Sequence, residues 1–147
     1  MENYDRYYHL AYSYTHNEAD AQDIVQNGVY KAIFYSDKLE NIEYAKTWIY
    51  RIMLNETFDL LKKQRGSSLD ELAFETGKED LYVDIDLQRA LNSMSKEDKA
   101  VIELRFFEDL KLSEIAEILG ENVSTIKSRL YRGLKKMKLE LLDVWES

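Results

Sequence analysis

The sequence has no cysteine and no proline, and only five of its 147 residues are glycine. Without cysteine the chain has no disulfide, no thiolate metal site and no cysteine nucleophile. Without proline, few positions can break a helix. No apolar run approaches the ~18 residues of a membrane-spanning helix, and the polar N-terminus does not resemble a signal peptide. We therefore expect a cytoplasmic, mostly helical protein without a membrane span.

What the sequence does have is a sizeable apolar fraction and an acidic excess. Hydrophobic residues make up 45% of the chain, enough for a real core, and the net charge is −8. More than half of that excess lies in residues 66–84, which contain six acidic side chains and one basic side chain. These residues also lack a sustained hydrophobic period. We interpret 66–84 as an acidic linker that joins two small helical domains, residues 1–65 and 85–147.

Helical periodicity dominates residues 1–65. Asn17 is expected to cap a helix, with Asp20 as its capping-box acid, and a second helix is expected from Tyr44 to Lys63. The buried face of the first helix is predicted to contain Ala21, Ile24, Val25, Gly28, Val29, Ala32 and Ile33. That of the second is predicted to contain Ala45, Trp48, Ile49, Ile52, Met53 and Leu60. A glycine in mid-helix at position 28 predicts close helix packing there.

Periodicity resumes after the linker. A short apolar stripe is formed by Leu87, Ala90, Leu91 and Met94. Ser95, with Asp98 three residues later, is expected to cap a helix that continues through Glu108. The residues of this helix that are predicted to point inward are Val101, Leu104 and Phe107.

Residues 112–139 have the pattern of a helix-turn-helix. Ala116, Gly120 and Ile126 supply close packing, a turn that tolerates positive φ, and an apolar anchor, and Asn122 is expected to cap the second helix. That helix carries a run of cations with no acid among them: Lys127, Arg129, Arg132, Lys135, Lys136 and Lys138. In so acidic a chain, this run indicates a surface for nucleic acid. Because the net charge repels phosphate at long range, we expect weak DNA binding unless a partner delivers the protein.

Three stretches, taken in order, resemble the extracytoplasmic-function (ECF) sigma factors, the small two-domain members of the bacterial sigma factor family. The first is DAQDIVQ at residues 20–26. The second is WIYRI at residues 48–52, followed by Asn55 and Asp59. The third combines IAEILG at residues 115–120 with TIKSRL at residues 125–130. Together they cover both domains and most of the chain.

The resemblance implies an all-α fold of two helical domains, the C-terminal one a helix-turn-helix. It implies an RNA polymerase sigma factor, which directs promoter recognition and DNA strand opening and is not an enzyme. The implied partners are core RNA polymerase, through its β′ clamp helices and β flap, promoter DNA and an anti-sigma factor. No cofactor, metal or small-molecule substrate is implied. The sequence itself has no phosphate-binding loop, no nucleophile with a positioned base and no clustered metal ligands.

The resemblance also assigns side chains to three surfaces. The polymerase-binding residues would be Asp23, Gln26, Asn27 and Tyr30. The minus-ten promoter element would be bound by Arg51, Asn55, Lys62 and Lys63. The minus-thirty-five element would be bound by Ser124, Thr125, Lys127, Ser128, Arg129 and Arg132.

Elementary chemistry agrees with these assignments. Strand opening needs cations for the backbone and planes that hold unstacked bases. Major-groove reading needs short polar side chains at the start of a helix and basic ones along it. Arg132 and Lys136 lie further from the helix start, so we expect them to contact phosphate rather than bases.

From the residues alone, other interpretations stay open. The basic helix could be only a solvated face, and Trp48 is more simply a core residue than a DNA contact. A homodimeric helix-turn-helix regulator would bind duplex DNA without polymerase. A sigma-like interaction protein without promoter activity is favoured by Glu56 and Glu121, because these acids stand where the family usually has small or apolar residues.

Overall fold

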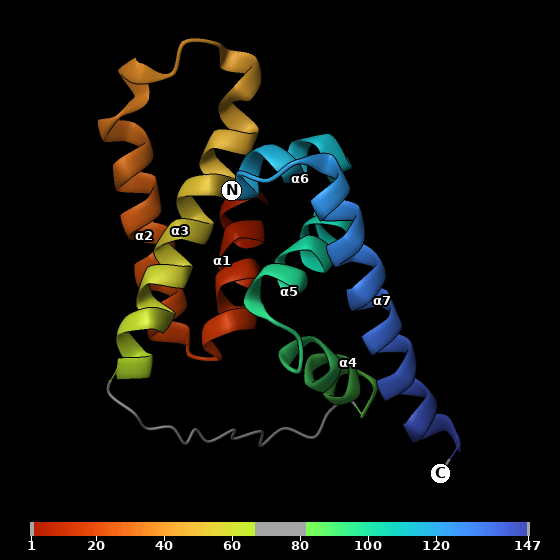
Figure 1. Ribbon diagram of the computed structural model, residues 1–147. Coiled ribbons are helices and arrows are strands. Elements are labelled where there is room, and N and C mark those ends of the chain that lie inside the picture. The colour runs from red at the N-terminus through yellow and green to blue at the C-terminus, as the bar shows by residue number, and fades with distance from the viewer. Residues whose placement is uncertain (1, 67–81, 147) are drawn as a thin grey trace. The chain divides into compact units, whose positions relative to one another are not determined.

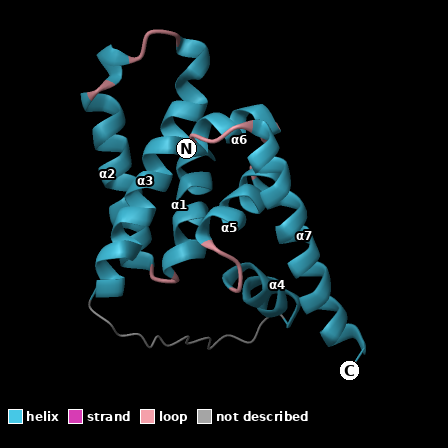
Figure 2. Ribbon diagram, viewed as in Figure 1, coloured by secondary structure: helices cyan, strands magenta, loops and turns pink. Residues whose placement is uncertain are grey.

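Every element in the described part of the chain is a helix. The computed structural model describes residues 2–66 and 82–146, where helices are joined by short turns (Figures 1 and 2). The all-α prediction is confirmed. No helix among these residues combines the length and apolar character needed to cross a membrane. The predicted linker lies largely outside the described residues, and its described ends, Gly66 and Tyr82–Asp84, are helical.

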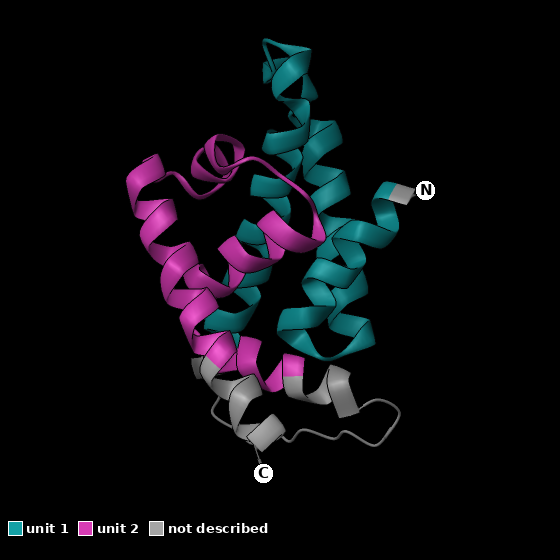
Figure 3. Ribbon diagram, turned by 90° about the vertical axis from the view of Figure 1, so that its right-hand side faces the viewer, with its two compact units in different colours: residues 1–75 teal, residues 76–147 magenta. Residues whose placement is uncertain are grey.

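The chain divides into two units, residues 1–75 and 76–147, which we call unit 1 and unit 2 (Figure 3). Unit 1 is built from the α-helices α1 (Glu2–Thr15), α2 (Glu18–Phe34) and α3 (Ala45–Gly66). The 3-10 turns η1 (Ser36–Lys38) and η2 (Ile42–Tyr44) lead from α2 to α3. α2 and α3 run side by side and extend beyond the N-terminal end of α1 (Figures 1 and 3).

The N-terminus of α2 is capped as predicted. Asn17 Oδ1 accepts a 2.9 Å hydrogen bond from the backbone N–H of Asp20. The capping-box role of Asp20 is wrong, because its carboxylate accepts a 2.9 Å hydrogen bond from Gln64 Nε2 on α3. The Asn17 N–H donates instead to Thr15 Oγ1. A partner 44 residues away thus determines the role of this acid, which a local pattern does not reveal.

The buried face of α2 is shorter than predicted. Its buried residues are Ala21, Ile24, Val25 and Gly28. Val29 and Ile33 are 38% and 69% exposed, so their placement in the core is wrong. The reason is geometric: the last turns of α2 run past the end of α1 and pack against α3 on one side only (Figure 1).

Gly28 marks the closest approach of α2 and α3. A Cβ at this position would lie 2.4 Å from Met53 Sδ, inside van der Waals contact. The glycine therefore lets Met53 fill the space between the helices, and Met53 is only 1% exposed. This confirms the close packing predicted from a glycine in mid-helix, whose propensity cost is about 1 kcal/mol relative to alanine.

The core face of α3 is turned relative to the predicted one. Its most deeply buried side chains are Tyr50, Met53, Leu54 and Thr57, of which the prediction included only Met53. The predicted core residues Ala45, Trp48, Ile49, Ile52 and Leu60 are partly buried. The rotation arises because α3 packs against both α1 and α2. The Thr57 hydroxyl is satisfied in this core by donating to the Met53 carbonyl at 2.8 Å.

Unit 2 contains α4 (Tyr82–Asn92), α5 (Lys96–Ile102), a π-helical turn η3 (Glu103–Phe107), α6 (Leu112–Leu119) and α7 (Val123–Glu146). The predicted stripe before α5 packs inward, with Leu87 partly buried and the other members buried. These others are Ala90, Leu91 and Met94.

The predicted helix from Ser95 to Glu108 changes character halfway. Ser95 Oγ accepts a hydrogen bond from the Asp98 N–H at 3.1 Å, which confirms the N-cap. After Ile102 the backbone widens into η3. The extra residue in a π-turn shifts the helical register. As a result Leu104 is buried but Phe107 is 54% exposed, so the inward placement of Phe107 is wrong.

α7 packs closely against α5 at Gly133. A Cβ there would lie 2.9 Å from Ile102 Cγ1. Ile102 and Ile126 are 1% and 0% exposed and hold the first half of α7 against the core of unit 2. This packing leaves the opposite side of α7 in solvent, where most of the candidate DNA-binding residues lie.

Candidate nucleic-acid interface

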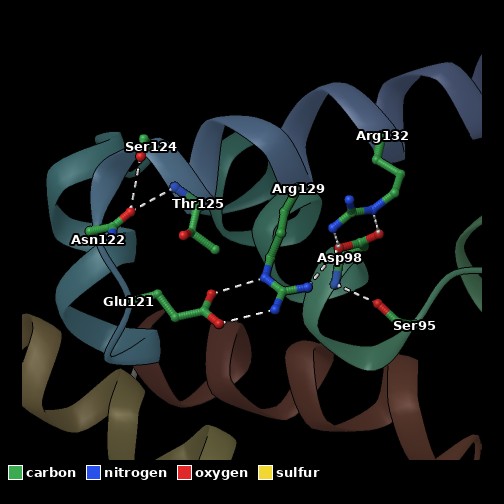
Figure 4. A network of polar contacts seen from close by, with 8 residues as sticks. All are labelled: Ser95, Asp98, Glu121, Asn122, Ser124, Thr125, Arg129 and Arg132. Carbon is green, nitrogen blue, oxygen red and sulfur yellow. Dashed lines mark hydrogen bonds and ion pairs between the residues drawn. The ribbon is translucent and has the colours of Figure 1, made fainter.

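The turn between α6 and α7 has the predicted geometry. Gly120 adopts φ 70°, the left-handed conformation that glycine tolerates best. Ala116 and Ile126 are buried on either side of the turn. Asn122 caps α7 by accepting the Thr125 N–H at 2.8 Å, and it also accepts the Ser124 hydroxyl at 3.1 Å (Figure 4). The helix-turn-helix prediction is confirmed, including its cap.

The first turns of α7 present the short polar and basic side chains predicted for the minus-thirty-five element. Ser124, Lys127 and Ser128 are exposed, and Thr125 is partly buried. Their exposed row starts at the helix N-terminus, where backbone N–H groups favour negative charge. The predicted cations Lys135 and Lys138 are also exposed, and Lys136 Nζ donates to the Ser93 carbonyl at 2.9 Å.

Arg129 is held within the protein. Its Nε and Nη2 donate to the two carboxylate oxygens of Glu121 at 2.9 and 3.0 Å, and its Nη1 donates to Asp98 Oδ1 at 3.0 Å (Figure 4). The side chain is only 20% exposed. The guanidinium therefore joins the turn before α7 to the start of α5.

Arg132 shares the same acidic partner but stays open to solvent. Its Nε donates to Asp98 Oδ2 at 2.8 Å and its Nη2 to Asp98 Oδ1 at 3.2 Å, while 58% of the side chain is exposed (Figure 4). We call Asp98, Glu121, Arg129 and Arg132 the arginine network. It brings together two predicted DNA contacts and two acids that the sequence does not connect with them.

The electrostatics of the arginine network keep both acids ionised. Burial acts to raise the pKa of Asp98, but the hydrogen bonds and charges of Arg132 and Arg129 lower it overall. The hydrogen bond from Arg129 lowers the pKa of Glu121. The pKa of Arg129 is raised by its hydrogen bonds to Glu121 and Asp98. The network therefore contains two cations and two anions near neutral pH.

In unit 1, the predicted polymerase-binding residues share one exposed face of α2. Their spacing of three and four residues places Asp23, Gln26, Asn27 and Tyr30 along one side of the helix, and all four are exposed. The Tyr30 ring stacks on Phe34, with centroids 6.0 Å apart. The face is thus acidic at one end and aromatic at the other.

The predicted minus-ten residues line the exposed side of α3. Arg51, Asn55, Lys62 and Lys63 are all exposed, and none of them forms an ion pair within the described residues. The neighbouring acid, Glu56, pairs with Lys31 of α2, which raises the pKa of that lysine. A paired acid repels DNA less than an isolated one, so Glu56 does not argue against DNA binding here.

Sequence reasoning missed several exposed apolar side chains near these surfaces. Around the connection from α2 to α3, Phe34 and Tyr44 are 61% and 52% exposed, and on α7 Tyr131 is 69% exposed. The signal for Phe34 was the aromatic pair at residues 34–35, which directly follows the predicted core stripe ending at Ile33. Tyr131 lies four residues after Lys127, on the exposed side of α7.

Within the described residues, no group of three or more His, Asp or Glu side chains could hold a metal ion.

Two family models match the chain, and their descriptions are Sigma-70 region 2 for residues 1–67 and Sigma-70, region 4 for residues 84–137. The two matches fall in the two units. They occur in the order in which the sequence motifs were found.

Individual relatives agree with the family models. The chain is 47% identical over 139 residues to RNA polymerase sigma factor SigV of Bacillus subtilis, covering 92% of this chain and 84% of that protein. It is 30% identical over 159 residues to ECF RNA polymerase sigma factor SigW of the same organism, covering 95% and 85%. Among solved structures, the sigma factor RpoE of Bartonella quintana, in complex with the anti-sigma factor NepR, superposes with a TM-score of 0.75 at 25% identity, covering 94% and 91%.

Proposed function

Because the chain belongs to the ECF sigma factors of the sigma-70 family, we propose how its surfaces divide the work of transcription initiation. It is an RNA polymerase sigma factor, which directs promoter recognition and strand opening, and its partners are RNA polymerase and promoter DNA. The matched families are those of initiation factors and not of catalysts. In this proposal the chain chemically transforms no substrate, and it works in the cytoplasm beside the chromosome.

We assign the minus-thirty-five element to residues 85–147, with α7 in the major groove. The observation that carries this assignment is the capped start of α7, where Asn122 orients the first turn and exposed Ser124, Lys127 and Ser128 follow. A helix that enters the major groove with its N-terminal residues forward uses such side chains for bases and phosphates. Tyr131 lies on the same exposed side and adds an apolar surface for thymine methyl groups.

We assign the minus-ten element to residues 1–65. Arg51, Asn55, Lys62 and Lys63 form a cationic and amide-bearing line along α3. The exposed rings of Phe34 and Tyr44 lie on the segments that precede it. Aromatic planes beside cations suit unstacked bases of a single strand. Arg51 and Asn55 lie in the half of α3 that follows these rings, and this combination supports strand opening at the α2–α3 end of unit 1, whereas Lys62 and Lys63 lie in the last turns of α3.

For polymerase we propose the exposed face of α2, with Asp23, Gln26, Asn27 and Tyr30 against the β′ clamp helices, and a contact of unit 2 with the β flap. The mix of carboxylate, amides and an aromatic ring suits a polar protein interface with one aromatic anchor. The Bartonella relative was solved with an anti-sigma factor. We extend that to this chain and propose that an anti-sigma factor controls it.

The alternative of a sigma-like protein without promoter activity rested on Glu56 and Glu121. Glu56 is paired with Lys31, and Glu121 is paired with Arg129, so neither carboxylate faces DNA as an isolated charge. That support is therefore removed.

The test is transcription by core RNA polymerase reconstituted with the full chain on a library of promoter sequences. We expect specific initiation from promoters with two conserved elements. Binding to core without specific initiation would contradict the proposal, and failure to bind core would contradict the polymerase-binding face as well. The Asn55→Ala variant should reduce strand opening in a permanganate footprint, because it removes the amide from the line on α3. An unchanged footprint would remove Asn55 from the minus-ten surface.

A further inference from the structure

Arg129 and Arg132 are both predicted DNA contacts, yet the structure uses them differently. All three nitrogens of the Arg129 guanidinium donate within the protein, to Glu121 and Asp98. Arg132 donates to Asp98 only through Nε and Nη2, and its Nη1 has no hydrogen bond within the described residues. Every nitrogen of the Arg129 guanidinium is therefore engaged, whereas Arg132 keeps one edge of its guanidinium for a ligand.

The edge of Arg132 that stays open is a fork of two parallel N–H groups, one on Nη1 and one on Nη2. A guanidinium has five N–H donors in a rigid plane, and the carboxylate of Asp98 holds the neighbouring edge, which is formed by Nε and Nη2. Asp98 is itself anchored, because it is only 6% exposed and its backbone N–H donates to the Ser95 cap. The direction of the fork is thus set by the protein before DNA arrives.

The position of Arg132 on α7 also suits a base contact. Ser124, Ser128 and Arg132 follow one another at intervals of four residues, so they form one row on the exposed side that begins at the helix N-terminus. The long arginine side chain extends the reach of this row beyond the two serines.

The charge of the arginine network decides between base and phosphate. Two arginines and two carboxylates cancel, so the cluster has little net attraction for a phosphate. Asp98 would also lie close to any phosphate that Arg132 bound and would repel it. A base edge is neutral, and the O6 and N7 atoms of guanine accept a parallel pair of N–H groups. The exposed lysines of α7 do not belong to the arginine network, and we assign phosphate binding to them.

We propose that Arg132 reads a guanine in the major groove of the minus-thirty-five element, and that Asp98 is the positioning residue that orients its guanidinium. This rests on the assignment of α7 to that element. It replaces the expectation, drawn from distance along the helix, that Arg132 contacts phosphate. Arg129 in this scheme ties the turn to α5 and does not read DNA.

The experiment compares full-chain variants in reconstituted polymerase on a library that varies every minus-thirty-five position. Arg132→Ala should reduce the preference for guanine at one position by about 10- to 100-fold. Arg132→Lys should reduce it less, because an ammonium can still donate to O6 and N7 but has no planar fork that Asp98 can orient. Asp98→Asn should reduce the guanine preference at the same position, although Arg132 remains. The control Lys127→Ala should weaken binding to all promoter sequences alike. It should also reduce the slope of the salt dependence by about the amount expected for one phosphate contact.

Three results would overturn the inference. Arg132→Ala could weaken all sequences equally with a shallower salt dependence, which would make it a phosphate contact. Arg132→Lys could keep the full guanine preference, which would show that the fork oriented by Asp98 is not needed. Asp98→Asn could keep the guanine preference while hydrogen exchange shows that the variant is folded, which would remove the positioning role of Asp98. If the wild type initiates without any minus-thirty-five preference, the assignment of α7 fails instead.

A measurement on the unmodified chain covers the case in which Asp98→Asn does not fold. Nitrogen-15 NMR of the Arg132 side chain should show slow rotation of the guanidinium and slow exchange of its Nε–H, because both are held by Asp98. Fast rotation and exchange like those of an exposed arginine would contradict the proposal.

Discussion

In unit 1 the candidate DNA-binding side chains project from a helix held by apolar packing, whereas in unit 2 one of them, Arg132, belongs to an ion-pair network that ties α7 to α5. The buried polar residues described in unit 1 are hydroxyl-bearing: Ser13, Thr47 and Thr57. Those described in unit 2 carry charge: Asp98, Lys99, Glu103 and Glu108. Burial lowers the pKa of Lys99 to about 8, and its Nζ donates to Asn92 Oδ1 at 2.8 Å.

This difference has a consequence for function. A surface that is separate from the core can change its DNA-binding residues without loss of stability. A surface built from an ion-pair network cannot, because removal of one partner leaves the others buried or unpaired. We therefore expect stability and promoter preference to be coupled in unit 2 and independent in unit 1.

The largest expected effect is on the apolar core of unit 1. Leu54→Ala removes a side chain that is 1% exposed, and it should lower the stability of unit 1 by about 2–5 kcal/mol. Hydrogen exchange resolved by peptide should show faster opening of α1, α2 and α3. The control Ile42→Ala alters a side chain that is 79% exposed and should have almost no effect. Equal loss in both variants would contradict packing as the source of stability.

The next effect is on the arginine network of unit 2. Asp98→Ala leaves Arg129 and Arg132 without their shared acceptor, and it should lower the stability of unit 2 by about 1–3 kcal/mol. Hydrogen exchange should report this loss in α5 and α7. Asp59→Ala, which removes an exposed acid of α3, is the matched control and should change stability by less than about 0.5 kcal/mol. Similar effects of the two substitutions would remove the contrast between the units.

A smaller effect is expected from acid. The pKa values of Asp98 and Glu121 are lowered from their ordinary values of 3.8 and 4.5. These two carboxylates bind protons less readily in the folded state than in the unfolded state. Their contribution to the stability of unit 2 is therefore fully present at pH values above these ordinary pKa values. It is lost as the pH falls through the lowered ones. Hydrogen exchange can monitor the denaturant unfolding of unit 2 at a series of pH values from 5 downward. The stability of unit 2 should fall over this series, and the fall should be smaller in Glu121→Gln. An identical pH dependence in that variant would contradict the assignment.

The smallest effect is expected at the ion pair of unit 1. Lys31 and Glu56 join α2 to α3, but the lysine side chain is 50% exposed. Partly exposed pairs contribute about 0–1 kcal/mol. Lys31→Met should therefore change the stability of unit 1 little, in contrast to Asp98→Ala in unit 2. A loss as large as that of Leu54→Ala would show that unit 1 also depends on charge.

Much of the fold was predictable because the signals are local. Asn17, Ser95 and Asn122 each cap a helix through a group three residues later in the chain, and Gly120 takes the turn conformation that its lack of Cβ allows. The errors lie where a helix meets several neighbours or changes register. Examples are the rotated core face of α3 and the exposed Phe107 after the π-helical turn.

The candidate site was predictable in part. Sequence reasoning placed Ser124, Lys127 and Ser128 on an exposed helix start, and the structure has them exposed there. It separated Arg129 from Arg132 only by their distance from the helix start, because both are cations on one basic helix. Their difference depends on Asp98, which the sequence presents only as part of a helix cap.

By itself, therefore, the sequence determined most of the helices, three of their N-caps, the helix-turn-helix and the family, since each of these depends on short spacings or on motifs in order. Only the tertiary structure decided what the arginines of α7 do. Asp98 lies 31 residues from Arg129 and 34 from Arg132 in the chain, and it meets them because α5 and α7 pack together. Such a contact is a property of the packed core, and no local pattern contains it.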